Sequence, residues 1–420
     1  MLSNIAFTFV FLIATTLILQ RYFSLPRNIW LLFLIQPLVM AASPVIVFIG
    51  GILSTKLTNN VELATLPITI MIMGVASAAI PAALLAKRWG RKIATFIGFS
   101  IGLLATMLAC IATLKASFEL FVIASLFFGV STAFIQQLRF AAIESTKKVD
   151  DVPKTLSILM LSGLFSAFLG PEIAVTAKDW ITSPFGYTGS FVFLAVLFII
   201  AMILLIFFID PQFKNSNQQG HIRPLSSIIK QPIFIIAIVA AATGFALMSY
   251  LMTATPLSMH NIDGHSLQDT KWVIQTHIAA MYIPSLFTGW LVKKIGLHRL
   301  MLLGTSIYAL MALIAFSGEQ VVHYWWALLL LGVGWNFLFL TGTSLLPLSY
   351  QQSERHKVQA LNDFIIFAVQ AIASLLAGWI LFKTSWHSLV LTSIPFIVLI
   401  FTVSFFYLKY QAKQCITPQE

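Results

Sequence analysis

Residues 83–92 read ALLAKRWGRK, and residues 289–296 read GWLVKKIG. Both stretches follow a long apolar run and place two basic residues and one apolar residue before a glycine, Gly90 or Gly296. Basic residues directly after an apolar run are typical of the cytoplasmic end of a membrane helix. The stretch therefore predicts a membrane protein, and its second copy, 206 residues later, predicts that the chain repeats itself.

Two further pairs of positions support a duplication. Gly129 and Gly332, each followed by valine, lie 203 residues apart, as do Lys154 and Lys357. Similarity at a nearly fixed offset is the mark of an internal repeat. The polar stretch 210–231 lies between the two copies and separates them.

The composition excludes a soluble protein. Hydrophobic residues make up 59% of the chain and charged residues 9%, against about 45–50% and about 25% in soluble domains. Continuous apolar runs of about 20 residues predict membrane helices rather than the short alternating segments of a β-barrel. Thirteen such runs span 4–20, 29–53, 65–86, 93–113, 119–143, 155–177, 189–209, 232–257, 272–292, 300–317, 324–348, 361–382 and 388–408.

The distribution of basic residues predicts the orientation. If loop 21–28 is cytoplasmic, nineteen of the 25 lysines and arginines fall inside and five fall outside, with Arg139 within a span. This split follows the positive-inside rule, and it accounts for the net charge of +11 without any nucleic-acid partner. The five outside residues are Lys56, Lys115, Lys178, Lys271 and Lys383.

The first run, 4–20, lacks a basic n-region and a cleavage site, so we expect an extra helix with its N-terminus outside rather than a signal peptide. A loosely held peripheral helix is the alternative. The expected organisation is the extra helix with a basic loop at 1–28, six-helix bundles at 29–210 and 232–410, a cytoplasmic inter-bundle loop at 211–231 and a cytoplasmic tail at 411–420.

Two halves of six spans, with the motif G-x-L-x-D-R-x-G-R-[KR] after the second span of each, resemble the major facilitator superfamily over about residues 29–410. The resemblance implies an all-α polytopic membrane protein with the major facilitator fold, plus the extra N-terminal helix. It also implies a solute site near the midplane between the halves. The first copy departs from the motif at Ala83, where the family has glycine, and at Lys87, where it has an acid.

The same resemblance implies a conformational latch. In the family the motif acid contacts the start of the eleventh helix, which begins here with Asp363, so a pair of Lys87 or Arg88 with Asp363 is the hypothesis for a latch of reversed sign. Glu144 matches the acidic helix end that pairs with the loop arginine, here Arg91; an ordinary interfacial charge is the alternative. The latch set is completed by Gly90 in the first copy and by Gly289, Lys293, Lys294 and Gly296 in the second.

Polar residues within the spans are the candidates for solute binding, because ionisable groups in a membrane are costly and usually functional. Arg139 and Gln136 share a helix face, although Arg139 alternatively snorkels to the inner surface. Trp335 offers a ring for stacking and Asn336 a donor and an acceptor, with helix packing beside Gly334 as the alternative. Gln36, Tyr250 and Thr253 complete the set.

Three residues are candidates for a coupled proton. Burial would raise the pKa of Glu172 towards neutrality, although Glu172 could equally face water at the outer mouth. Asp363 is the second candidate. His277 is the third, and a hydrogen-bonded packing role is the alternative for it. Gly170-Pro171 resembles part of the exporter motif, but the motif's later glycines are absent, so uptake is slightly favoured.

These observations predict a secondary active transporter that moves a small organic solute by alternating access, with proton coupling. Strings such as QLRFAA (137–142) and QALNDF (359–364) resemble a bacterial branch of the superfamily that we associate with riboflavin or siderophore movement. A multidrug or metabolite exporter with proton antiport is the alternative. Enzyme and channel motifs are missing, and we expect no cofactor, no metal, a monomer, and the cell inner membrane with a cytoplasmic C-terminus.

Overall fold

The structure, a computed structural model, describes residues 2–146, 152–210 and 223–416, and within these ranges every regular element is helical. Apolar surroundings explain this, because a backbone in lipid must satisfy its own polar groups. The first half contains α1 (Leu2–Tyr22), α2 (Arg27–Met40), α3 (Ala42–Leu57), η1 (Val61–Leu63), α4 (Leu66–Trp89), α5 (Arg91–Lys115), α6 (Phe118–Ile135), α7 (Leu138–Ser145), α8 (Val152–Thr176) and α9 (Thr188–Ile206).

The second half repeats this all-helical pattern after the polar stretch. It contains α10 (Leu225–Ile228), α11 (Pro232–Pro256), η3 (Leu257–Ile262), α12 (Leu267–Tyr282), α13 (Ser285–Ser317), α14 (Val321–Leu345), η4 (Leu346–Ser349), η5 (Gln352–Glu354), α15 (Arg355–Lys383) and α16 (Trp386–Ile416). The predicted tail 411–420 therefore begins as helix, and its last four residues lie outside the described ranges. Most of the predicted loop 211–231 also lies outside them.

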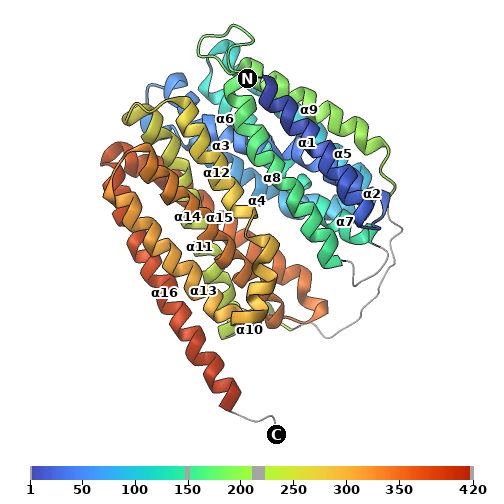
Figure 1. Ribbon diagram of the computed structural model, residues 1–420, viewed down its shortest axis with the longest axis vertical. Helices are drawn as coiled ribbons and strands as arrows, with labels where there is room; N and C mark the ends of the chain where they lie inside the picture. Colours follow the sequence, from blue (N-terminus) through green and yellow to red (C-terminus); the bar gives the residue numbers. More distant parts are fainter. Residues whose placement is uncertain (1, 147–151, 211–222, 417–420) are drawn as a thin grey trace.

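The two halves lie side by side (Figure 1), with α1 to α9 in blue to green and α10 to α16 in yellow-green to red. They meet where α4 packs against α15, α8 against α12 and α3 against α11. These three helix pairs come from distant parts of the sequence, so the space between the halves is lined from both.

Twelve helical segments of the described residues are long and apolar enough to cross a membrane, whereas the sequence predicted thirteen. The difference lies in the run 272–292, which is not one helix. It divides into α12, of 16 residues, and the first turns of α13, with Ile283 and Pro284 between them. Proline lacks the amide hydrogen that a continuous helix needs, so the apolar run breaks there.

The break after α12 is stabilised by Asn336 of α14. Its Nδ2 donates to the Met281 carbonyl oxygen at 2.8 Å and to Ser285 Oγ at 2.6 Å. This carbonyl lies at the C-terminal end of α12, where intrahelical donors run out. Asn336 therefore holds α12, α13 and α14 together at the position where the helix is interrupted.

The predicted duplication is visible in how the helices pack. A Cβ at Gly129 of α6 would collide with the Met71 carbonyl oxygen of α4, and a Cβ at Gly332 of α14 would lie 2.6 Å from the His277 carbonyl oxygen of α12. Met71 and His277 are 206 residues apart, the same offset as Gly90 and Gly296. Each half thus uses a glycine at the matching place for close helix packing.

The two motif glycines also share one backbone conformation. Gly90 has φ 88° and ψ 163°, and Gly296 has φ 79° and ψ 162°. This region is essentially restricted to glycine. At Gly90 the space is also filled, since an added Cβ would lie 2.5 Å from Asp210 Oδ2, whose Oδ1 accepts the Lys92 amide at 2.9 Å. Asp210 thereby caps the start of α5.

Helix α1 lies on the outside of the first half and packs on α8 and α2. Ile5 and Leu12 are buried against its neighbours, and Asn4 Nδ2 donates to Glu172 Oε1 of α8 at 3.2 Å. The helix therefore makes specific contacts, and its N-terminus lies at the same end of the molecule as Glu172. These contacts favour the expected extra helix over the alternative of a loosely held one, and the outside position of its N-terminus stays a prediction.

Arg223 and Glu354 connect the segment before α10 to the turn before α15. Arg223 donates from its amide and from Nε to Glu354 Oε1, each at 2.8 Å, and from Nη2 to Glu354 Oε2 at 2.7 Å. The Glu354 side chain is 1% exposed. The Arg223 guanidinium lowers the pKa of Glu354 from 4.5 to about 2.

The shared conformation of Gly90 and Gly296 gives a matched pair of variants. Gly90→Ala should lower the free energy of unfolding by about 1–3 kcal/mol from backbone strain, with a further loss from the collision with Asp210. Gly296→Ala carries the same strain but meets only the His298 ring, at 3.1 Å. Thermal unfolding in detergent should rank Gly90→Ala as the less stable variant, and equal losses would contradict the role of Asp210.

The lowered pKa of Glu354 predicts a pH-dependent contribution to stability. A carboxylate whose folded pKa is depressed stabilises the protein above its unfolded pKa and loses that effect as pH falls through the folded value. Glu354→Gln should therefore lower the melting temperature at pH 7, and its difference from the wild type should shrink between about pH 4.5 and about pH 2. A difference that does not change with pH would argue against the ion pair.

Candidate functional site

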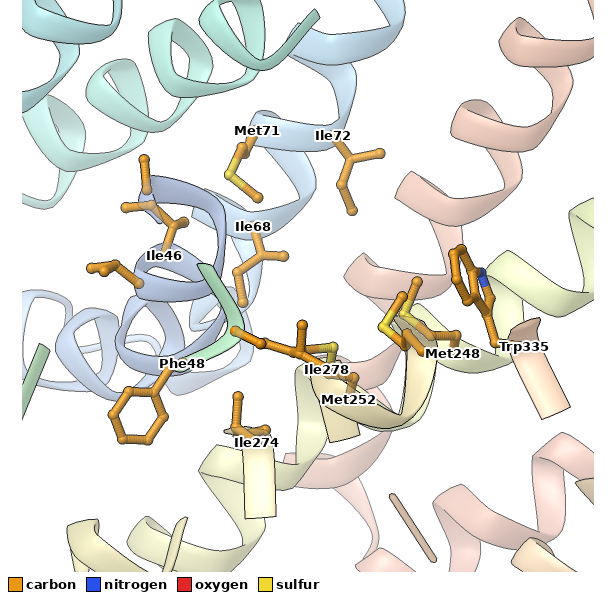
Figure 2. Packing of buried hydrophobic residues seen from close by; sticks show 14 of the residues in the cluster. Ile46, Phe48, Ile68, Met71, Ile72, Met248, Met252, Ile274, Ile278 and Trp335 are labelled. Atoms are coloured by element: carbon orange, nitrogen blue, oxygen red, sulfur yellow. The ribbon is translucent and has the colours of Figure 1, made fainter. Parts of the chain in front are cut away.

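A cavity of about 160 Å³ lies between the two halves, lined by residues of α2, α3, α4 and α8 from the first and α11, α12 and α15 from the second. Figure 2 shows Ile68, Met71 and Ile72 on one side and Met248, Met252 and Ile278 on the other. Its position between the halves matches the place where the sequence predicted a solute site.

Methionine dominates the apolar lining. Unbranched thioether side chains are flexible and polarisable, so they adapt to the shape of a ligand and contact aromatic rings favourably. The cavity therefore offers an adjustable apolar surface. The lining methionines are Met40, Met71, Met248, Met252 and Met281.

The polar lining consists of hydroxyl groups and one amide, and none of the lining residues is charged. Ser43 pairs with Thr132 at 3.3 Å, and Thr253 with Ser374 at 3.3 Å. The cavity thus suits an uncharged solute that carries both apolar surface and hydrogen-bonding groups. The polar lining residues are Ser43, Ser166, Ser249, Thr253, Tyr282 and Gln370.

Of the residues predicted to bind solute, the structure places Thr253 in the lining. Three others contact protein instead. Gln36 donates to the Leu159 carbonyl at 3.2 Å, Tyr250 pairs with Thr392 at 2.6 Å, and Asn336 bridges the break after α12. Gln136 lies between α6 and α7, outside the lining.

Trp335 belongs to an aromatic cluster with Phe245, Phe339 and Phe367. Its ring stacks on Phe339, with centroids 5.0 Å apart, and meets Phe245 edge-on at 5.1 Å. Phe245 is also edge-on to Phe367 of α15, at 6.3 Å. The cluster adjoins the cavity beside Met248 (Figure 2), and the Trp335 Nε1 is buried without a partner among the described residues.

Arg139 of the first half and Asp363 of the second half interact electrostatically with each other. Arg139 also lies 4.8 Å above the Phe140 ring, and its side chain is exposed rather than enclosed in the cavity. Asp363 accepts from Asn362 Nδ2 at 2.9 Å. The basic group that acts electrostatically on Asp363 is therefore Arg139, which the sequence had assigned to solute, although the two form no ion pair among the described residues.

The predicted pair of Lys87 or Arg88 with Asp363 is not formed. Both basic side chains are exposed, and neither makes an ion pair within the described ranges. The Arg88 guanidinium lies 5.9 Å from the Trp89 ring. Because α4 ends at Trp89, the two residues point to the surface beside this ring rather than across to α15.

Arg91 and Glu144 do lie together. Arg91 Nε donates to Glu144 Oε2 at 2.9 Å, Nη2 donates to Oε1 at 2.5 Å, and Nη1 donates to Gln137 Oε1 at 3.1 Å. This two-pronged geometry is the strong form of an arginine–carboxylate pair. It ties the start of α5 to α7 within the first half.

The second copy of the motif has no such acid. Lys294 lies 5.0 Å from the Trp290 ring, and Lys293 is exposed. Gly289 lies in α13, and Gly296 marks the kink within it. The two copies therefore share their backbone but not their charge pairing.

The end of the molecule opposite the Arg91–Glu144 pair is closed by contacts between the two halves, and we call it the closed end. Lys271 Nζ lies 2.7 Å from Glu172 Oε2, and both side chains are nearly buried, at 5% and 6% exposure. The sequence had assigned Lys271 to an outside loop, whereas it lies buried in α12. Of the two alternatives for Glu172, burial agrees with this pair and a position open to water does not. Thr176 also donates to Glu172, at 3.3 Å.

Further contacts join the halves at the closed end. Gln275 donates to the Phe168 carbonyl at 3.0 Å, Asn261 to Thr55 at 2.8 Å, and Lys383 pairs with Glu62 at 2.8 Å. The hydrogen bonds and ion pairs between the described parts of the two halves are confined to this end. Sequence spacing gave no signal for them, because the partners are about 100 to 320 residues apart.

His277 is buried in α12 and takes no part in the closed end. Its Nδ1 lies 2.7 Å from the Leu328 carbonyl oxygen of α14. Nε2 is buried without a partner among the described residues. The contact with Leu328 is that of a residue that packs α12 on α14.

Comparison with known proteins places this architecture in a family. The sequence model of the Major Facilitator Superfamily matches residues 29–267 and 262–420. The chain is 34% identical over 376 residues to the riboflavin transporter RfnT of Brucella anthropi, covering 89% of this chain and 94% of that protein. It is 29% identical over 379 residues to the uncharacterized MFS-type transporter YddS of Bacillus subtilis, covering 86% of each.

Solved structures show the same fold at low sequence identity. A bacterial homologue of the human lysosomal transporter Spinster, inward-facing and occupied, aligns with a TM-score of 0.68 at 12% identity, covering 90% of this chain and 95% of that one. The nucleoside transporter NupG aligns with a TM-score of 0.67 at 13% identity, covering 90% and 99%. These relatives are transporters and not enzymes, and the chain belongs to the Major Facilitator Superfamily.

Proposed function

We propose that this transporter carries riboflavin, or a flavin of closely similar structure, into the cell. The observation that carries the proposal is the 34% identity, along nearly the whole chain, to a riboflavin transporter. A siderophore, the second solute that the sequence suggested, has no such relative among the proteins compared.

The chemistry of the cavity supports a flavin. Riboflavin is uncharged at neutral pH and combines a flat aromatic ring system with a chain of hydroxyl groups. The cavity combines methionine side chains, which contact aromatic rings favourably, with hydroxyl groups and one amide, and its lining carries no charge. An anionic solute would need a cation here, and Arg139 is outside the lining.

The size of the cavity implies a conformational change on binding. At about 160 Å³ it is smaller than the ~300–1,000 Å³ typical of ligand pockets. The halves contribute opposite walls, so a small rotation of one against the other would widen it. Binding in a widened state and release after closure of one end would constitute alternating access.

We place the closed end outside and the Arg91–Glu144 end in the cytoplasm of a bacterial inner membrane. The excess of basic residues near Arg91 supports this orientation. Contacts between the halves at the closed end, and the inward-facing state of the Spinster homologue, support an inward-facing conformation. In this state Arg91–Glu144 would brace one half, whereas Glu172–Lys271 would hold the halves together.

Glu172 is our first candidate for the coupled proton, ahead of Asp363 and His277. Its ion pair joins the halves and must break when the closed end opens. Once the pair with Lys271 is broken, the carboxylate is free to exchange a proton. Proton binding at Glu172 would therefore favour the state that is open to the outside.

Riboflavin should stabilise the purified protein in detergent. A ligand at about 100 times its dissociation constant adds roughly 2.7 kcal/mol when it binds only the folded state. We expect a rise in melting temperature with riboflavin, and saturable counterflow of labelled riboflavin in proteoliposomes. Ferric siderophores, nucleosides and amino acids serve as controls in the same panel. A shift with another class and none with riboflavin would refute the solute assignment.

Removing one partner of the buried pair should be costly. Glu172→Gln leaves Lys271 buried and unpaired, for which we expect a loss of about 3–5 kcal/mol in the free energy of unfolding. Glu62→Gln is the matched control, because its pair with Lys383 is 34% and 51% exposed and such pairs contribute under about 1 kcal/mol. If thermal unfolding shows that Glu172→Gln and Glu62→Gln lose similar stability, the buried pair of Glu172 contributes no more than an exposed one.

The same variant tests proton coupling, because glutamine mimics the protonated carboxyl. Riboflavin uptake by Glu172→Gln in proteoliposomes should lose the pH dependence of the wild type, while Glu62→Gln should keep it. If uptake by Glu172→Gln responds to pH as the wild type does, the coupled proton must be carried by another residue.

A further inference from the structure

Gln370 of α15 differs from the other amide side chains in the interior. It lines the cavity, and its Oε1 is buried without a hydrogen-bond partner among the described residues. Other interior amides are bonded to the protein: Gln36 to the Leu159 carbonyl, Gln275 to the Phe168 carbonyl, and Asn336 to the Met281 carbonyl. Gln370 is thus an amide that lines the cavity and whose acceptor oxygen has no protein partner among the described residues.

An unpaired buried acceptor destabilises a protein, because the group has lost its hydrogen bonds to water without gaining others. Native proteins keep few such groups, and those they keep call for an explanation. Gln370 lies on the same helix as Phe367, whose ring joins the aromatic cluster of Trp335. The helix that carries this amide thus lines the cavity and also contributes a ring to the aromatic cluster.

We propose that Gln370 recognises the imide edge of the flavin ring system, an inference that rests on riboflavin as the solute. The carboxamide has both an acceptor oxygen and donor hydrogens. Its Oε1 accepts from the ring N–H between the two carbonyl groups of the flavin, and its Nε2 donates to one of those carbonyl oxygens. Gln370 is then a specificity-determining residue, because this paired edge distinguishes a flavin from apolar aromatic compounds of similar size.

The neighbouring hydroxyl groups complete the arrangement. Ser249 of α11 and Ser166 of α8 lie in the same lining, on opposite sides of the interface between the halves. Hydroxyl groups both donate and accept, so they suit the flexible hydroxylated chain rather than the rigid edge. The amide and the hydroxyls thus address different parts of one solute.

The test compares riboflavin with 3-methylriboflavin, in which a methyl group replaces the imide hydrogen. Binding to purified protein in detergent is measured by quenching of flavin fluorescence. The wild type should bind riboflavin about tenfold more tightly than the methylated compound, in line with the loss of a buried hydrogen bond. Gln370→Leu should weaken riboflavin binding about tenfold and bring the ratio of the two dissociation constants close to one.

Gln359→Leu is the matched control. It makes the same substitution on the same helix, about 16 Å away along the axis, where Gln359 donates to the Tyr350 hydroxyl at 3.0 Å. Gln370→Asn, which keeps the amide on a shorter side chain, should retain part of the discrimination. Melting temperatures of all variants without flavin establish that each is folded.

The outcomes separate this inference from the solute proposal. A wild type that prefers riboflavin, with Gln370→Leu binding both flavins equally and Gln359→Leu unchanged, supports Gln370. A Gln370→Leu variant that still discriminates tenfold overturns its role while leaving riboflavin as the solute. A folded wild type that binds neither flavin overturns the solute proposal and this inference together.

Discussion

A backbone amide or carbonyl in lipid must find its hydrogen-bond partner within the protein, and the rest of this structure depends on that constraint. Continuous helices satisfy it by themselves. Where a helix stops or breaks, a side chain takes over: Asn336 binds the Met281 carbonyl before Pro284, and Asp210 binds the Lys92 amide after Gly90. Polar residues that look like solute ligands in an apolar sequence can therefore be engaged with the backbone.

The two halves share backbone conformation and packing at the matching glycines, and they differ in their ion pairs. Gly129 and Gly332 allow the same close packing, and Gly90 and Gly296 the same sharp turn. In the first half the motif arginine, Arg91, binds Glu144, whereas the second copy has no acid at the matching place. At these positions only glycine fits, whereas a charge pair can be replaced by other contacts. The two halves therefore keep the same backbone shape but not the same ion pairs.

Charge is kept at the two ends and away from the centre. The buried Glu172–Lys271 pair and the Lys383–Glu62 pair lie at the closed end, and Arg91–Glu144 lies at the other. A charge near the midplane costs at least ~2.5–3.5 kcal/mol on insertion scales, and the neutral cavity avoids that cost. In the function we propose, the charged ends control the conformation and the neutral centre fits an uncharged solute.

The sequence by itself determined the membrane class, the all-helical fold, the duplication and the family. These properties follow from the length of the hydrophobic runs and from the repeated glycines, which can be read without knowing which helices touch. It also indicated the cavity region, in which Thr253 lies. The tertiary structure decided that Asn336 and Tyr250 bind protein, that Lys87 does not reach Asp363, and that Lys271 is buried against Glu172. Those outcomes depend on which helix faces lie opposite each other, and apolar periodicity is weak when every face of a helix is hydrophobic.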